Sequence, residues 1–296
     1  MMNEHALSVR EAVAKITRGE LAVGELLSTY LEKIEMLEGQ VGAWSYFNRE
    51  SVLDQVGVFA NNVRDAALIA GVLRAGAQRN ISSRNPKENV SANPGLREPK
   101  EAVQPKLAFI KSPVWNEATI TTQQACMNFI KELGADVDEI DLPQLCDHSI
   151  KCHRTIMLYE MARNYQSFYD DHYEQISKTL LDMIEEGRRI PLAAYQEADE
   201  TAMAITDLVD IILSPYDAVL TPATPSEAPK GLESTGSPIF CTVWSLCGVP
   251  AISLPVLKGE GNMPLGLQLV GARGMDEKLI ESADWIEHFY HSTKID

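Results

Sequence analysis

The fold class follows from residues 107–143, which read LAFIKSPVWNEATITTQQACMNFIKELGADVDEIDLP. Leu107–Ile110 is a short apolar run, Thr121–Leu133 has helical character, and Val137–Leu142 is a second short run that stops before Pro143. This order of strand, helix and strand predicts two parallel strands joined by a right-handed crossover. The sequence therefore predicts an α/β protein.

The residues that follow continue the alternation of helices and strands. Helices are expected within residues 146–213, and three further apolar runs, each bounded by proline or glycine, are typical of buried sheet strands. A closing amphipathic helix is expected at Asp276–Tyr290. The expected helices are Ile156–Tyr169, Leu180–Glu186 and Leu192–Leu213, and the expected strands are Ala218–Leu220, Ala251–Val256 and Leu265–Val270. With the first two strands, the sheet is predicted to contain about five strands.

The N-terminal part of the chain predicts shorter helices and one long loop. Residues 1–50 predict two amphipathic helices, the first opened by a capping box of Ser8 and Glu11, and then a short aromatic strand at Ala43–Phe47. Small and branched apolar residues at Asp65–Arg74 predict another helix. Residues 76–105 are rich in proline, asparagine and serine and lack apolar periodicity, so we expect an extended surface loop.

Composition limits the kinds of partner and the compartment. The 296 residues include 42 Asp and Glu against 26 Lys and Arg, so the net charge of −16 repels phosphate and excludes nucleic acid and anionic membranes as partners. The longest uncharged apolar run, Ala66–Leu73, has eight residues, whereas a bilayer span needs about 20. Five scattered cysteines and an N-terminus without a secretory signal predict a cytoplasmic protein with reduced thiols.

A metal site would have to come from the cysteine and histidine residues near position 150. His148 and Cys152 are four positions apart, so on a helix they would share a face, and Cys146 and His153 lie close to them in sequence. No Cys-x-x-Cys pair and no second pair of ligands accompanies them, and a helix that carries these residues without a metal is the simpler interpretation. We therefore expect neither a metal nor another cofactor.

The residue patterns contain no recognisable catalytic group. There is no Gly-x-Ser-x-Gly elbow, no pair of adjacent glycines that could form an oxyanion-binding turn, and no phosphate-binding glycine loop. Cys241 and Cys247 lie in a stretch that is typical of a helix in a protein core. A catalytic pair of carboxylates stays an open alternative, because the chain contains many acidic residues. Residue chemistry alone thus assigns no catalytic residue.

Five segments, taken together, resemble one known family. They are Leu7–Asn48, Asp54–Leu68, Tyr216–Pro225, Gly248–Pro255 and Pro264–Gly271. They are similar, in this order, to the N-terminal helices and first strand, the segment after the nucleophile region, an inner strand with its pocket loop, and two C-terminal strands of the amidase signature family. Its members are serine hydrolases that cleave a carboxamide to a carboxylate and ammonia. The resemblance implies one domain over residues 1–296, with an amidase-signature-like sheet flanked by helices and an α/β portion at residues 106–296.

The middle of the family pattern is absent. Family members use a serine, a cis-peptide serine and an unprotonated lysine, which lie between the first strand and the segment that begins here near Asp54. In this sequence Ser45–Glu50 leads almost directly into that segment, and the lysines upstream of it, Lys15 and Lys33, match no catalytic motif. None of the three catalytic residues can be assigned, and the junction lies near residues 50–53. The domain is therefore expected to be incomplete, without central strands and helices and with open sheet edges.

By this resemblance, five residues in the C-terminal part would border the substrate pocket. They are Thr221, Thr224, Ser237, Phe240 and Trp244. Their residue chemistry also fits structural roles, because the threonines can end a strand and a turn, and Ser237 can cap a helix that has Pro238 at its first position. Phe240 and Trp244 are four positions apart, as on the buried face of a helix.

Three hypotheses about function follow. The first is a truncated amidase homologue, a pseudoenzyme with little or no hydrolysis of its own, whose ligand is at most a small-molecule amide. The second is an active amidase that has recruited Thr221, Thr224, Ser237 or Cys241 as nucleophile, although none has a visible base. The third is a non-catalytic binding or regulatory protein that pairs, through its exposed edges, with a second copy or with an intact amidase-like partner.

Overall fold

A computed structural model describes residues 58–71, 103–134, 136–231 and 233–293, together with Lys15, Arg18 and Glu20. The chain divides into two compact units, Met1–Glu101 and Ala102–Asp296. In the first unit, residues 63–71 are helical, in agreement with the helix expected at 65–74 as far as that segment is described. The two N-terminal helices, the first strand, the junction at 50–53 and nearly all of the loop at 76–105 lie outside the described residues.

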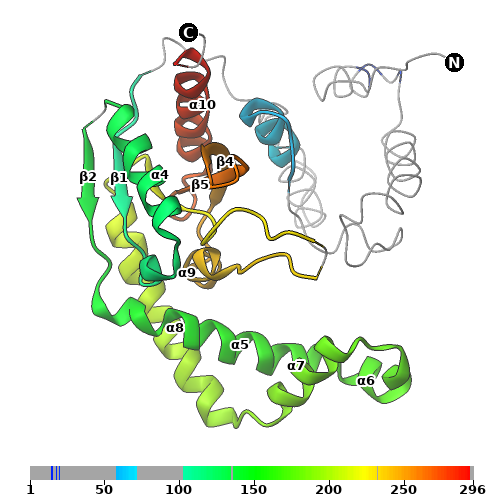
Figure 1. The fold of residues 1–296 in the computed structure, drawn as a ribbon. Helices are drawn as coiled ribbons and strands as arrows, with labels where there is room; N and C mark the ends of the chain where they lie inside the picture. The colour runs from blue at the N-terminus through cyan, green and yellow to red at the C-terminus, as the bar shows by residue number, and fades with distance from the viewer. Residues whose placement is uncertain are drawn as a thin grey trace, which may run out of the picture. The chain divides into compact units, whose positions relative to one another are not determined.

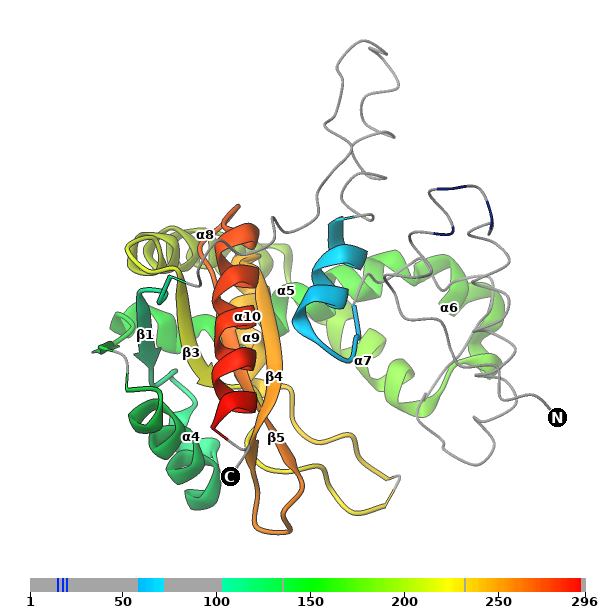
Figure 2. The same ribbon diagram turned by 90° about the horizontal axis from the view of Figure 1, so that it is seen from above.

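The second unit contains a five-stranded mixed sheet with the order β2-β1-β3-β5-β4 (Figures 1 and 2). Its strands are β1 (Leu107–Ile110), β2 (Val137–Ile140), β3 (Ala218–Pro222), β4 (Ala251–Lys258) and β5 (Pro264–Val270). β1 lies between β2 and β3 and is parallel to both, which confirms the parallel pair predicted from the strand–helix–strand pattern. β5 runs antiparallel to both β3 and β4.

The outer strand β4 differs from the buried strand that the sequence predicts. β3 is buried along its whole length, whereas Ala251, Ser253 and Pro255 of β4 are exposed. The prediction of a buried β4 is therefore wrong, because β4 is the last strand on its side of the described sheet. Pro255 lacks a backbone donor and lies at a register shift against β5, and both features are typical of an edge strand.

Helices cover both faces of the sheet. α4 (Ile120–Glu132) and α10 (Asp276–Ser292) pack on one face, where Phe129 and Phe289 meet edge to face with 6.3 Å between their ring centroids. α8 (Leu192–Leu213) and α9 (Ile239–Cys247) pack on the other face, and their apolar residues join those of β1, β3 and β5 in one buried cluster (Figure 2). The sheet thus has a buried layer on each side.

α5 (Ser149–Asn164), α6 (Gln166–His172) and α7 (Lys178–Arg188) form a helical arm that extends away from the sheet (Figure 1). α5 and α7 pack closely at Gly187, where a Cβ atom would lie 2.0 Å from the carbonyl oxygen of Leu158. The single helix expected at Ile156–Tyr169 is broken, because the backbone leaves helical geometry at Tyr165 between α5 and α6. The remaining elements are short 3₁₀ turns, η2 (Trp115–Glu117), η3 (Gln144–His148) and η4 (Tyr173–Gln175).

Candidate functional site

A row of polar side chains crosses the sheet near the end of β3. Thr221 of β3 pairs with Gln268 of β5, and Gln268 pairs on its other side with Ser253 of β4. Directly paired residues of antiparallel strands project from the same face, so these three side chains are neighbours. Val219 and Val270 lie two residues away on the same face, and they belong to the buried cluster that α9 completes. The polar row therefore lies on the same face as α9, where Thr221 and Gln268 are buried and Ser253 is exposed.

Three buried polar atoms in this layer have no hydrogen-bond partner among the described residues. They are Oγ1 of Thr221, Oε1 of Gln268 and Nε1 of Trp244, and their residues are at most 5% exposed. An unpaired buried donor or acceptor destabilises a fold by about 1–3 kcal/mol, so such atoms require a partner. A hydroxyl, an amide carbonyl and an indole N–H supply both donors and acceptors, which is the complement of a carboxamide or of a water molecule.

Phe240 and Thr224 lie in different surroundings from one another. Phe240 is buried on the same side of α9 as Trp244, within the core. Thr224 is exposed in the loop after β3, and its Oγ1 donates to the carbonyl oxygen of Ser226 over 2.9 Å. The structure thus brings Thr221, Phe240 and Trp244 into the core and leaves Thr224 on the loop.

Ser237 is also exposed, just before α9. Its Oγ accepts a hydrogen bond from the backbone N–H of Ile239 at 3.4 Å. Pro238 occupies the N-cap position, so α9 begins one residue later than the sequence indicates. The expected proline at the first helical position is therefore wrong, whereas the Ser237 hydroxyl still accepts from a backbone donor at the start of the helix.

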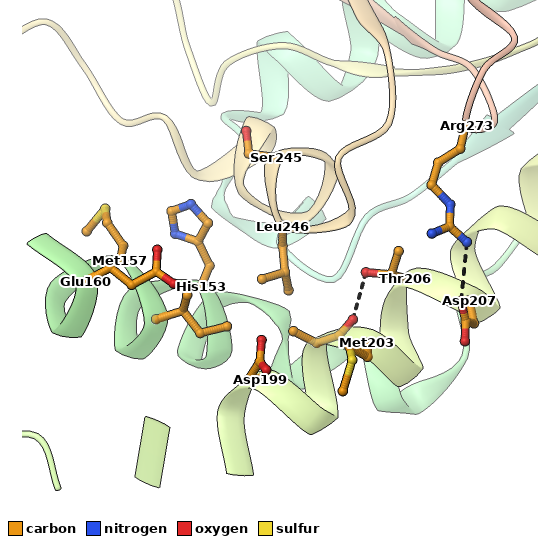
Figure 3. A pocket seen from close by; sticks show the side chains of 12 residues that line it. His153, Met157, Glu160, Asp199, Met203, Thr206, Asp207, Ser245, Leu246 and Arg273 are labelled. Carbon is orange, nitrogen blue, oxygen red and sulfur yellow. Dashed lines mark hydrogen bonds and ion pairs between the residues drawn. The ribbon is translucent and has the colours of Figure 1, made fainter. Parts of the chain in front are cut away.

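A hollow of about 590 Å³ opens between α5, α8 and α9 (Figure 3). α9 borders it with Ser245 and Leu246, whereas Trp244 and Phe240 point to the buried layer. α5 contributes Glu160 among others, and α8 contributes residues that include aspartates. None of the five sequence-predicted pocket residues lines this hollow.

The basic side chain at the hollow is already paired. Arg273, in the loop after β5, lies 3.2 Å from an oxygen of Asp207 and 3.4 Å from an oxygen of Asp210. Its backbone N–H also donates to Asp210 over 2.9 Å. Arg273 therefore holds that loop against α8, and its positive charge is balanced by these two aspartates.

Two other carboxylates at the hollow lack such a counter-charge. Glu160 of α5 accepts a hydrogen bond from the Tyr195 hydroxyl over 3.0 Å, and Asp199 of α8 is exposed. Neither forms an ion pair within the described part of the chain. His153, which also lines the hollow, has its pKa lowered by burial, which favours the neutral imidazole. The sequence pattern does not indicate this site, because charged helix positions usually face solvent and His153 suggests only a metal ligand.

Comparison with known proteins identifies the family of this chain. The family model described as Amidase matches residues 37–280, more than half of the chain. The chain belongs to the amidase family. The resemblance drawn from the sequence is thereby confirmed at the level of the family.

Relatives of this amidase-family chain include components of a larger enzyme. A subunit of the mitochondrial glutamyl-tRNA(Gln) amidotransferase of Mus musculus is 26% identical over 277 residues, covering 79% of this chain and 51% of that protein. The corresponding amidotransferase subunit of Staphylococcus epidermidis is 28% identical, covering 82% of this chain and 56% of that protein. A crystal structure of an amidase matches with a TM-score of 0.64 and 26% identity, covering 77% of this chain and 51% of that one. The chain thus spans about half the length of the relatives it matches.

The metal hypothesis finds no support in the positions of its residues. Cys152 packs against Ala198 and Ala202 of α8, whereas His148 is exposed at the end of η3. Across the described ranges, no group of three or more histidine, cysteine, aspartate or glutamate side chains is placed to hold a metal ion.

No helix in the described part of the chain combines the length and apolar character that a membrane crossing requires.

The cysteines of this amidase-family chain are all free thiols. Cys241, a candidate nucleophile, donates from its Sγ to the carbonyl oxygen of Ala223 over 3.6 Å, and burial raises its pKa. Burial raises the pKa of Cys126 to about 12, and burial together with the nearby Cys247 raises that of Cys146 to about 11. Since the thiolate is the reactive form, these surroundings suppress nucleophilic chemistry.

Proposed function

We propose that this amidase-family chain does not hydrolyse carboxamides by itself. One observation carries the proposal: Ser45–Glu50 leads into Asp54 without a glycine-rich serine segment or a matching lysine. Loss of a serine nucleophile lowers kcat by about a millionfold in subtilisin. Without the loop that would bind the oxyanion, the usual source of residual rate is also missing.

The described residues supply no replacement for the missing nucleophile and base. Thr221 has an unpaired Oγ1, and Cys241 donates to a backbone carbonyl, so neither contacts a side chain that could take its proton. A hydroxyl or thiol is a weak nucleophile until an adjacent base or a lowered pKa activates it. These contacts argue against the hypothesis of an amidase with recruited catalytic residues.

We propose that the chain retains the side of the pocket that recognises the amide. Thr221 and Trp244 bring unpaired hydrogen-bonding atoms to the layer beneath α9, and Gln268 adds a third. Phe240 would close this layer with an apolar ring, and Thr224 and Ser237 would border it from the loops. The ligand in this proposal is a small-molecule carboxamide that is bound and not cleaved.

Ammonia release from the intact chain tests the proposal. The purified protein is first shown to unfold cooperatively, and the same sample is then incubated with simple aliphatic and aromatic carboxamides beside an intact amidase as positive control. We expect no ammonia above the buffer blank. Release that follows the main protein peak on a sizing column, and that disappears in Cys241→Ala or Thr221→Val, would overturn the proposal and identify the replacement nucleophile.

A second candidate function is that of a binding or regulatory component of an assembly. The exposed face and edge of β4, at Ala251, Ser253 and Pro255, favour it, because an uncovered strand is a surface for another chain. The relatives that are named as amidotransferase subunits support an assembly-forming role. The expected result is a dimer, or a complex with an intact amidase-like protein, on a sizing column. A monomer that stays monomeric in the presence of such a protein would exclude this candidate.

We also infer a cytoplasmic location. All five cysteines are free, and cysteines that remain reduced are typical of proteins kept in a reducing compartment. Fractionation of cells that express the tagged chain tests this inference, with the tag expected in the soluble cytosolic fraction. Recovery in a membrane or organelle fraction would contradict it.

A further inference from the structure

We propose that the hollow between α5, α8 and α9 binds an aliphatic ammonium ligand, such as a small diamine. The hollow measures about 590 Å³, which lies within the range of about 300–1,000 Å³ that is typical of small-molecule sites. It is separate from the polar row beneath α9, and the inference does not depend on the proposed loss of hydrolysis. Figure 3 shows Glu160 and Asp199 reaching it from two different helices.

The charges around the hollow favour a cation. Glu160 and Asp199 contribute two negative charges, and neither forms an ion pair among the described residues. Arg273 cannot neutralise them, because its guanidinium is held by Asp207 and by the neighbouring Asp210. His153 adds no positive charge at neutral pH while its imidazole stays unprotonated. The lining is therefore negative overall, and an ammonium group is the simplest counter-charge.

The walls between these carboxylates favour methylene groups. Met157 and Ile156 of α5, Met203 of α8 and Leu246 of α9 line the hollow, and Met203 is 56% exposed. Exposed apolar side chains in a concave surface gain free energy when a ligand removes them from water. Methionine side chains also adapt to ligands of different shape. An alkyl chain with an ammonium end matches both the apolar walls and the acidic groups.

The contribution of each carboxylate sets the size of the expected effect. A solvent-exposed ion pair is worth a factor of about 1.4 to 5 in affinity, so two such pairs together contribute about tenfold. The affinity should therefore fall as salt rises, because salt screens exposed charges. A neutral ligand of the same length would lose both pairs and keep only the apolar contacts.

Calorimetric titration of the 296-residue chain with cadaverine tests the proposal. The comparison ligand is the matching diol, in which hydroxyl groups replace both amino groups, and the variants are Glu160→Gln, Asp199→Asn and their combination. Glu200→Gln is the matched control, because Glu200 is exposed on the same helix as Asp199 and does not line the hollow. Circular dichroism and the unfolding midpoint show whether each variant is folded.

We expect saturable binding of cadaverine, about tenfold weaker binding to the double variant, and a change of less than about twofold for the control. Equal binding of the diol to the unaltered chain would overturn the proposal, as would unchanged binding to the folded double variant or the absence of saturable heat at millimolar ligand. A lysine side chain of another protein carries the same ammonium group, so a short lysine peptide is titrated in parallel. Tighter binding of that peptide than of cadaverine would overturn the assignment to a small molecule.

Discussion

The two sides of α9 show how differently one short helix can be used. The inner side packs Phe240 and Trp244, each 1% exposed, against the sheet. The outer side presents Ser245 and Leu246 to an open hollow whose carboxylates come from other helices. The residues that the family resemblance marks as pocket are thus mostly enclosed in a layer with unpaired polar atoms. The concave surface that is open to ligands combines apolar side chains with acidic residues that the sequence pattern assigns to solvent.

Truncation of Trp244 should have the largest effect on the free energy of unfolding. Trp244→Ala removes a fully buried indole and is expected to lower the free energy of unfolding by about 3–5 kcal/mol. Ser245→Ala, at an exposed position on the outer side of the same helix, is expected to change it by about 0.5 kcal/mol or less. Denaturant unfolding measures both. Equal losses for the two variants would show that the inner and outer sides of α9 are not distinct.

The cysteine thiols should also differ in reactivity according to how deeply each is buried. Burial raises the pKa of Cys126 from 9.0 to about 12, which lowers the thiolate fraction at pH 8 by about a thousandfold. Cys241 is partly exposed at the end of the buried layer and should be alkylated first, with a rate that rises with pH as its thiol ionises. Mass spectrometry after timed iodoacetamide treatment gives the order. Faster labelling of Cys126 than of Cys241 in the folded protein would contradict the burial argument.

Much of the fold could be predicted from the sequence because its boundaries are marked by local chemistry. α8 runs from Leu192 to Leu213 as expected, since Pro191 precedes the helix and Pro215 follows it. The parallel pair β1 and β2 follows from two short runs separated by one helix. Such signals depend on residues close in sequence, and for that reason they can be read without the structure.

Features that depend on residues far apart could not be predicted in this way. The exposure of Ser253 results from the place of β4 at the edge of the sheet, which is set by pairing with β5 and not by its own composition. The hollow forms where α5, α8 and α9 meet, and its acidic residues resemble any solvated helix face when they are read one helix at a time. The unpaired state of Thr221 likewise appears only when its neighbours across the sheet are known.

Replacement of Thr221 should show whether its buried hydroxyl needs a partner. Thr221→Val keeps the shape of the side chain and removes an unpaired Oγ1, so the protein is expected to gain about 1 kcal/mol in its free energy of unfolding. Thr224→Val is the control, because that hydroxyl is exposed and bonded to Ser226, and its effect should be close to zero. Denaturant unfolding of both variants gives the two differences. A loss of stability in Thr221→Val would indicate that a water molecule or ligand already satisfies the hydroxyl.

The carboxylates of the hollow should have the smallest effect on stability, which separates a binding role from a structural one. Glu160→Gln and Asp199→Asn each remove an exposed charge without an ion-pair partner in the described part of the chain, so unfolding free energies are expected to change by less than about 0.5 kcal/mol. A slight gain is favoured, because the chain carries a net charge of −16 and each variant reduces like-charge repulsion. Denaturant unfolding at low and high salt measures the effect, which should shrink as salt rises. A loss above about 1 kcal/mol in either variant would mean that the carboxylate supports the packing of its helix, and the acidic lining of the hollow would then be explained by the fold.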